Sequence, residues 1–399
     1  MKLASRSVCL RSITELWAHS NSIEQLHEQL KKLPDEVMPH FEPHLSFKIK
    51  VESFGHAQSL KEKIQKIETF SYLPIQGPIK LKNPDRSFLY TEYYGLTPNN
   101  VPEQPYHVFF GRVISSGQRN VISELSLKKR KFIGNTSMDA QLSLLMANMA
   151  KVSDGDLIFD PFVGSGSLLV AAARFGGHVL GADIDYLMLH GRTKPTRKQD
   201  RFKNRAVDES IYSNMKQYGI LNNYLDVVVA DSSLPLWRDD LIFDAIITDP
   251  PYGIREATER VGSTKSNVCL NENQVENHIP SKVTYNLAHI LSDLLCFASK
   301  HLKLGGRLVT WVPIFRSDYK EEDLPQHPNL ELVGNCEQVL SKYAARRLLT
   351  YEKKTQPQEN IVPNDIANSY LDFREKYFNH VRKTRKKYEA TKKFQAANG

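Results

Sequence analysis

The sequence is poor in cysteine and has no long apolar run. Its four cysteines, Cys9, Cys269, Cys296 and Cys336, are spread over 399 residues. No two of them have the short spacing of a structural zinc site, and so sparse a set is typical of a reducing compartment. No apolar stretch reaches the ~18 residues that a membrane-spanning helix needs. We therefore expect a cytoplasmic protein without a membrane segment, a disulfide framework or a metal site.

Acidic residues are also in the minority. The chain has 53 Lys and Arg against 45 Asp and Glu, which gives a formal net charge of +8. Such a surplus suits a polyanionic partner such as a nucleic acid. The densest basic run is Lys128-Lys129-Arg130-Lys131. We expect these four residues to contact RNA, although a solvated charged surface would have the same composition.

Residues 1–127 form a first unit in this interpretation. Helices are expected at 22–30 and 59–70, and strands at 47–51 and 107–114. The stretch from Pro74 to Pro105 is rich in proline and is expected to hold little strand. Tyr90, Tyr93 and Tyr94 lie within it. They fit either packing in the core or stacking on bases.

Residues 128–355 have the rhythm of a doubly wound α/β sheet, in which apolar strands alternate with helices. Five strands are expected at 156–160, 178–183, 226–231, 243–248 and 306–312, and two more at 330–340 and 347–353. Residues 356–399 are read as a basic, mostly helical tail. Two polar loops, 192–205 and 258–282, have no assigned role, although the second has the length of a lid over a base site.

The turn Asp160-Pro161-Phe162-Val163-Gly164-Ser165-Gly166 follows the first of these strands. A dinucleotide fingerprint would have Gly or Ala where this chain has Leu169. S-adenosylmethionine has no phosphate and carries two cationic centres, which suits an acid just before the turn. Its glycines let the backbone approach a ligand closely. The predicted cofactor set is Thr136, Asp160, Phe162, Gly164, Gly166, Asp183 and Asp231, with Asp183 facing the ribose and Asp231 the adenine.

Each of these acids alone could be an ordinary loop residue or helix cap. Together with Asp249, however, they stand at four consecutive strand ends, and the carboxyl ends of parallel strands are where ligands bind. An acid at each of four consecutive strand ends favours a ligand-binding site over a chance arrangement.

The stretch Asp249-Pro250-Pro251-Tyr252 ends the fourth strand and supplies the candidate catalytic residues. A nucleobase amine is a weak nucleophile because its lone pair is delocalised into the ring. The Asp249 carboxylate could accept one N–H of that amine and the Pro250 carbonyl the other, which would free the lone pair. Pro251 stiffens the turn, and Tyr252 offers a face on which the base can stack.

Three stretches together resemble the tRNA guanosine-10 N(2)-methyltransferase family: the glycine turn at 160–166, Gly181–Tyr186 and Asp249–Glu256. The lead-in Phe132–Asp139 is similar too. The resemblance implies a Rossmann-like methyltransferase sheet that uses S-adenosylmethionine, with a smaller N-terminal α+β THUMP-like RNA-binding region that is short in this chain. It further implies methylation of the guanine 2-amino group at tRNA position 10, and a heterodimer with a small zinc-binding activator subunit.

Two other functions remain open at this stage. The acid–Pro–Pro–Tyr stretch also occurs in adenine amino-methyltransferases that act on DNA or rRNA, although the N-terminal unit and the lead-in argue against them. A catalytically silent RNA-binding scaffold is the other alternative, and the intact acids at the strand ends argue against it.

Overall fold

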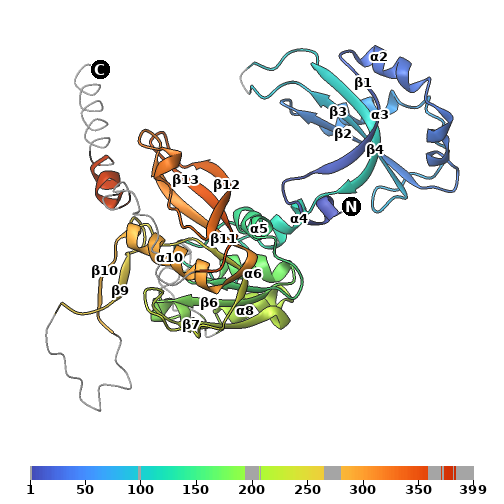
Figure 1. Ribbon diagram of the computed structural model, residues 1–399. Coiled ribbons are helices and arrows are strands. Elements are labelled where there is room, and N and C mark those ends of the chain that lie inside the picture. The colour runs from blue at the N-terminus through green and yellow to red at the C-terminus, as the bar shows by residue number, and fades with distance from the viewer. Residues whose placement is uncertain are drawn as a thin grey trace, which may run out of the picture. The chain divides into compact units, whose positions relative to one another are not determined.

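The computed structural model describes residues 2–97, 100–193, 206, 208–264, 280–357, 370, 373–380 and 382. The chain forms two compact units, Met1–Val121 and Ile122–Gly399 (Figure 1). Within the described residues, no helix is long and apolar enough to cross a membrane. The predicted tail helix lies mostly outside these residues, as do residues 194–205 of the first polar loop and residues 265–279 of the second.

The first unit is a four-stranded sheet in the order β1-β4-β3-β2. Its strands are β1 (Ser12–Ser20), β2 (Phe47–Phe54), β3 (Arg86–Tyr93) and β4 (His107–Ser116), and its helices are α1 (Lys2–Arg6), α2 (Ile23–Leu30) and α3 (Leu60–Glu68), with the 3-10 turn η1 (Asp35–His40). Local capping explains both predicted helices: Ser22 accepts from the Gln25 backbone N–H, and Ser59 forms a capping box with Glu62.

Strand β3 contradicts the prediction that the proline-rich stretch holds little strand. It pairs in parallel with β2 and antiparallel with β4, so it lies inside the sheet. Tyr90 and Tyr94 are buried and both donate to the Glu92 carboxylate. Those two tyrosines therefore pack in the core and do not face a base.

The second unit is built on a seven-stranded sheet in the order β12-β13-β11-β8-β5-β6-β7. All seven predicted strands are present, with small shifts in their ends: β5 (Leu157–Asp160), β6 (His178–Asp183), β7 (Tyr224–Val229), β8 (Phe243–Thr248), β11 (Leu302–Phe315), β12 (Leu330–Val339) and β13 (Ala344–Lys353). Strands β7, β6, β5, β8 and β11 are parallel, and β13 pairs antiparallel with both β11 and β12.

The remaining elements of this unit lie around the sheet (Figure 1). Its helices are α4 (Arg119–Glu124, which begins just before the unit boundary), α5 (Ala140–Met149), α6 (Ser167–Arg174), α7 (Tyr186–Leu189), α8 (Ile211–Gln217) and α10 (Leu287–His301), its 3-10 turns are η3 (Leu221–Asn223) and η4 (Glu321–Asp323), and a small hairpin joins β9 (Glu259–Val261) to β10 (Lys282–Thr284). Leu291, Leu294 and Leu295 of α10 are buried in one cluster with Phe159 and Phe243. Burial of each such side chain adds ~1.5–3 kcal/mol to the free energy of unfolding.

The strand order fixes where a ligand can bind. β5 pairs with β6 on one side and with β8 on the other, so the chain leaves β5 in one direction and returns in the opposite one. At such a switch point the loops after neighbouring strands separate and leave a crevice at their carboxyl ends. The turns after β5 and β8 are the glycine turn and the acid–Pro–Pro–Tyr turn.

Candidate functional site

The glycine turn keeps its backbone accessible. Gly164 and Gly166 have φ values of 49° and 75°, which L side chains rarely adopt. A Cβ on Gly166 would lie 2.8 Å from Ile211 of α8, so packing also requires glycine there. A Cβ on Gly164 would meet nothing within 4 Å, so its backbone borders open space. This is the position at which a ligand can approach the chain.

Asp160 joins the ends of β5 and β8 beneath this turn. It is 1% exposed, and its Oδ1 accepts from Thr248 Oγ1 at 2.6 Å and from the Phe162 backbone N–H at 3.0 Å. Burial raises the pKa of Asp160 to about 7, and the carboxylates of Asp183 and Asp249 add to the shift. A nearby cation would lower that pKa again.

Asp183 and Asp231 end the next two strands and are held by backbone N–H groups. Asp183 accepts from Gly164 and from Asp185, both at 2.8 Å. Burial raises its pKa. Asp231 accepts from Ser233 at 2.8 Å and from Val261 of β9 at 2.6 Å. The Asp183 contact ties the end of β6 to the glycine turn, and the Asp231 contact ties the end of β7 to the small hairpin.

The acid–Pro–Pro–Tyr turn begins directly after β8. One Asp249 oxygen accepts from the Tyr252 hydroxyl, and the other accepts from Arg346 Nη1 at 3.2 Å. Burial raises the pKa of Asp249, while the positive charge of Arg346 opposes that shift. Pro250 is buried, and Pro251 and Tyr252 are half-buried. A bond between Tyr252 and Asp249 was not predicted; it uses the hydroxyl and does not involve the ring face.

A second loop reaches this turn from the lead-in. Thr136 donates its hydroxyl to Glu256, and the Ser137 and Ser165 hydroxyls lie 2.5 Å apart. These contacts connect the lead-in with the glycine turn and with the segment that follows the acid–Pro–Pro–Tyr turn. Although part of the Glu256 side chain reaches the surface, desolvation raises its pKa to about 7, and Asp183, Asp249 and Asp185 add to the shift.

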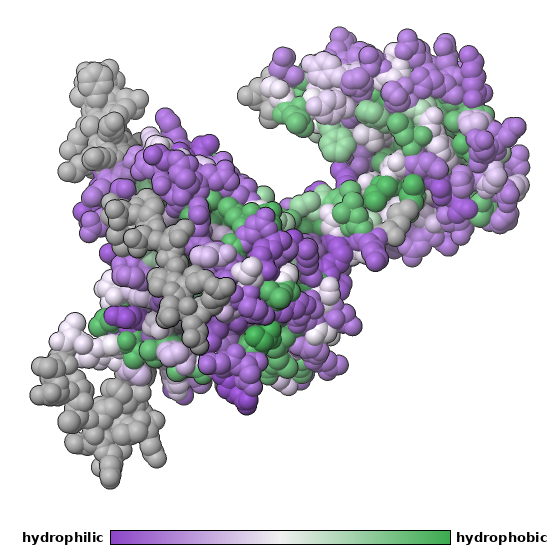
Figure 2. Space-filling view, viewed as in Figure 1, coloured by the Kyte–Doolittle hydropathy of each residue, from purple (hydrophilic) through white to green (hydrophobic). Residues whose placement is uncertain are grey.

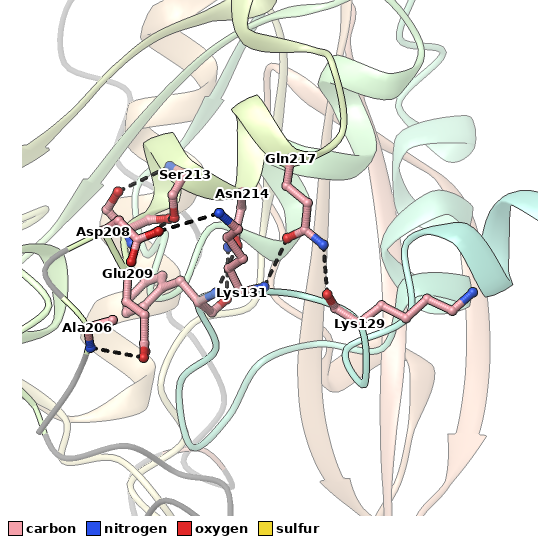
Figure 3. Close-up of polar contacts among 10 residues, drawn as sticks. Lys129, Lys131, Ala206, Asp208, Glu209, Ser213, Asn214 and Gln217 are labelled. Carbon is pink, nitrogen blue, oxygen red and sulfur yellow. Dashed lines mark hydrogen bonds and ion pairs between the residues drawn. The ribbon is translucent and has the colours of Figure 1, made fainter. Parts of the chain in front are cut away.

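The basic run 128–131 lies against α8 through its backbone. Figure 3 shows Gln217 between Lys129 and Lys131: it donates to the Lys129 carbonyl at 2.7 Å and accepts from the Lys131 N–H at 3.0 Å. Asn214 bridges the backbone N–H and carbonyl of Phe132 in the same way. The segment is therefore fixed on the second unit.

Within this run the prediction is wrong for Arg130. Its side chain is 1% exposed and donates to Ser167 Oγ at 2.8 Å and to the Leu125 carbonyl at 3.0 Å. It anchors the run on α6 and is not on the surface. Lys128, Lys129 and Lys131 are exposed, and Lys131 also lies 3.4 Å from Asp208.

The structure thus brings the predicted acids of β5, β6 and β8 into one crevice and adds two residues that were missed. Glu256 belongs to the stretch already quoted and could have been noted as a further acid. Arg346 gives no local signal, because it is 97 residues from Asp249 in the sequence. Among the described residues, no group of three His, Cys, Asp or Glu side chains could hold a metal ion.

Comparison with known proteins gives two family models that match the chain. The Tmrp11 THUMP N-terminal domain matches residues 1–119, and the RMKL-like methyltransferase domain matches residues 128–274. The Gallus gallus protein named tRNA (guanine(10)-N(2))-methyltransferase TRMT11 is 48% identical over 389 residues, which cover 96% of this chain and 84% of that protein. The Homo sapiens protein of the same name is 48% identical over 392 residues, with the same coverage. The Schizosaccharomyces pombe tRNA (guanine(10)-N(2))-methyltransferase is 36% identical over 380 residues, covering 94% of this chain and 76% of that protein.

Proposed function

The chain belongs to the tRNA (guanine(10)-N(2))-methyltransferase family, and we propose that it transfers a methyl group from S-adenosylmethionine to the 2-amino group of guanosine 10 in tRNA. The observation that carries the proposal is the adjacency of two turns. The acid–Pro–Pro–Tyr turn and the glycine turn follow the neighbouring strands β8 and β5. A hydrogen bond of 2.6 Å from Thr248 to Asp160 joins the ends of these two strands.

The residues of the crevice fit S-adenosylmethionine. Gly164 exposes its backbone to open space. The pKa values of Asp160, Asp183 and Glu256 are all raised, chiefly because burial disfavours the charged carboxylate and also because each of them lies near other acids. We assign the cofactor to Thr136, Asp160, Phe162, Gly164, Gly166, Asp183 and Asp231. When bound, it supplies an activated methyl group on a positively charged sulfur.

Asp249 and Pro250 prepare the amine. Each accepts one N–H of the guanine 2-amino group, so the nitrogen lone pair is drawn out of the ring. The new N–C bond forms as the C–S bond breaks, and the nitrogen then loses one proton toward Asp249 or water. Tyr252 stacks against the base while its hydroxyl holds Asp249. Positioning and a preorganised carboxylate supply most of the rate.

The two alternative functions predict different products from the one proposed here. An adenine amino-methyltransferase would use the same turn on DNA or rRNA, and a silent scaffold would bind RNA without turnover. Nucleoside analysis of tRNA from a deletion strain is the decisive experiment. We expect N(2)-methylguanosine at position 10 to disappear and to return with this chain but not with its Asp249→Ala variant. Unchanged tRNA modification together with lost adenine methylation would instead support the first rival.

We propose that residues 1–127 and the surface lysines Lys128, Lys129 and Lys131 bind the tRNA, that 128–355 are catalytic and that 356–399 form a basic tail. The match of residues 1–119 to a THUMP N-terminal domain supports the first assignment. A cytoplasmic location fits Cys9, Cys296 and Cys336, which are free thiols.

We also propose a small zinc-binding activator subunit as partner. Strand β7 supports this, since in the described part of the chain it pairs only with β6 and leaves one edge open. Leu225 and Val229 on β7 are 51% and 45% exposed, and Leu234 and Leu236 just beyond it are exposed as well. Figure 2 shows apolar patches in the region where Figure 1 places β7 and α8. An open strand edge beside apolar side chains suits a partner that adds a strand.

Co-expression with the activator tests this partner. Leu225→Lys with Val229→Lys should abolish co-purification, because charged side chains would enter the apolar contact. Leu304→Lys is the matched control, since Leu304 is similarly exposed, at 53%, on β11. Equal recovery of the activator with both variants would place the partner elsewhere.

A further inference from the structure

Arg346 is held on three sides at the edge of the crevice. It lies on β13, opposite Pro313 of β11 and Gln338 of β12. Trp311 is two residues from Pro313, so its side chain emerges on the same face of the sheet as Arg346. The Arg346 Nε donates to Gln338 Oε1 at 2.7 Å, and its guanidinium lies 4.1 Å from the centre of the Trp311 ring. On the third side, Arg346 Nη1 donates to Asp249 Oδ2 at 3.2 Å.

This arrangement fixes the guanidinium before any substrate binds. The Arg346 side chain is only 13% exposed. A guanidinium that is stacked on an aromatic ring and bonded through Nε has little freedom left, so its Nη1 presents a fixed donor. A lysine could not reproduce the planar stack and the second bond at once.

From these contacts we propose that Arg346 is a positioning residue for methyl transfer, holding the Asp249 carboxylate in the orientation and charge state that the target amine needs. The inference rests on the proposed function for its chemistry but not for its geometry. Arg346 itself exchanges no proton, because arginine stays charged at every physiological pH.

The charge state matters because burial acts against the ionisation of Asp249 and raises its pKa. The Asp249 carboxylate in turn raises the pKa values of Asp160 and Glu256, so the three acids share one crevice. Arg346 and the Tyr252 hydroxyl act on the pKa of Asp249 in the opposite direction to burial. A protonated Asp249 would present a donor to the amine on one oxygen, and one acceptor would be lost. Removal of Arg346 should therefore raise the pH at which Asp249 becomes an acceptor.

Arg347 offers a matched control on the same strand. It donates to Asn335 Oδ1 at 2.7 Å and lies 4.6 Å from the centre of the Tyr319 ring, so it has the same kind of stacked and bonded guanidinium. As the next residue in a strand it faces the other side of the sheet, and its described contacts do not include Asp249. Arg347→Gln removes an equal charge without touching the crevice.

The test compares Arg346→Gln, Arg346→Lys and Arg347→Gln in single-turnover methylation at saturating tRNA, from pH 6 to 9. We expect Arg346→Gln to be slower by ~10²-fold at pH 7 and to recover part of this loss at pH 9. Arg346→Lys should restore only part of the rate. Arg347→Gln should follow wild type, and calorimetric affinity for S-adenosylmethionine should change by less than about threefold in all variants.

A second measurement needs no turnover. Titration of the Asp249 carboxyl carbon by NMR, assigned with Asp249→Asn, should give a higher pKa in Arg346→Gln than in wild type or Arg347→Gln. Equal Asp249 pKa values, or a rate loss that is the same at every pH, would overturn the inference. If wild type does not methylate guanosine 10 while the Asp249 pKa still moves, the proposed function fails, but the inference that Arg346 holds the charge state of Asp249 stands.

Discussion

Asp249 is the residue on which the proposed chemistry depends. Substitution by alanine removes both its hydrogen-bond acceptor and its charge, whereas substitution by asparagine removes only the charge. Asp249→Ala should slow methyl transfer by ~10²–10⁴ because it removes a proton acceptor and a preorganised charge. Asp249→Asn should be milder, since an amide oxygen still accepts a hydrogen bond. Affinity for S-adenosylmethionine should barely change in either variant. Single-turnover rates and calorimetry measure the two effects, and an Asp249→Ala rate within threefold of wild type would contradict the mechanism.

The raised pKa values of Asp160 and Glu256 predict how pH acts on cofactor binding. Both are about 7 without ligand, so near neutrality each carboxyl is partly protonated. A cationic ligand favours the ionised form, and binding must then release protons. If one such group ionises fully, affinity should rise about eightfold between pH 6 and 7.5. Calorimetry in two buffers of different ionisation enthalpy measures the released protons.

S-adenosylhomocysteine is the control for that prediction, because it lacks the positive charge on sulfur. Its affinity should rise less steeply over the same pH range. Identical pH profiles for the two ligands would mean that Asp160 and Glu256 do not sense the sulfonium.

Residue roles could be predicted from the sequence only where the signal is local. The acids of the crevice stand at strand ends, so their place follows from the strand pattern, and their roles stay predictions. Arg130 and Arg346 show the limit. Four consecutive cations do not reveal that Arg130 turns inward onto Ser167, and Arg346 meets Asp249 only because β13 is inserted beside β11.

At the scale of elements, a downstream segment supports the acid–Pro–Pro–Tyr turn. Residues 373–380 are helical, and Phe373 is buried in the main core of the second unit. Arg374 Nε donates to the Gly253 carbonyl at 2.8 Å. Gly253 has a φ of 74°, so the turn takes a conformation that few residues adopt. A charged donor on its carbonyl helps to hold it there.

Arg374→Ala should therefore loosen the turn without disturbing the proposed cofactor residues. A hydrogen bond to a charged group contributes ~1.5–3 kcal/mol, so we expect single-turnover methylation to slow by about tenfold or more, with S-adenosylmethionine affinity retained. Arg382→Ala, an exposed arginine farther along the same segment, removes the same charge as a control. Equal rates for the two variants would show that the segment does not act on the turn.

Helices and strands could be predicted from the sequence where a single local pattern determines them. The five parallel strands of the second unit are mainly apolar and are followed by polar turns, and all five were predicted, although the ends of β7 and β11 are shifted. β3 was missed because the prolines around it masked its apolar residues, and its place between β2 and β4 depends on pairing with distant strands.

On the scale of the whole molecule, the net charge of +8 contributes to tRNA binding only where basic side chains contact backbone phosphates. Lys128, Lys129 and Lys131 are exposed on a segment whose backbone is fixed by Gln217 and Asn214. Cations on a fixed backbone lose less entropy when they bind than cations on a flexible one, because only their side chains have to be ordered. The three lysines are the residues of the predicted basic run that remain candidates for phosphate contact, because Arg130 is buried.

Reversing these three charges to Glu should weaken tRNA binding and make it less sensitive to salt. Each phosphate contact contributes roughly 0.7–0.9 to the slope of log affinity against log salt concentration. Loss of three contacts should therefore reduce the slope by about 2–3, measured by fluorescence anisotropy between 50 and 200 mM salt, the range in which such slopes are resolved. The triple Lys→Arg variant keeps the charge and should retain the wild-type slope. If the Glu variant keeps the wild-type slope as well, the three lysines face only water, and the tRNA must be held by other cations of the chain.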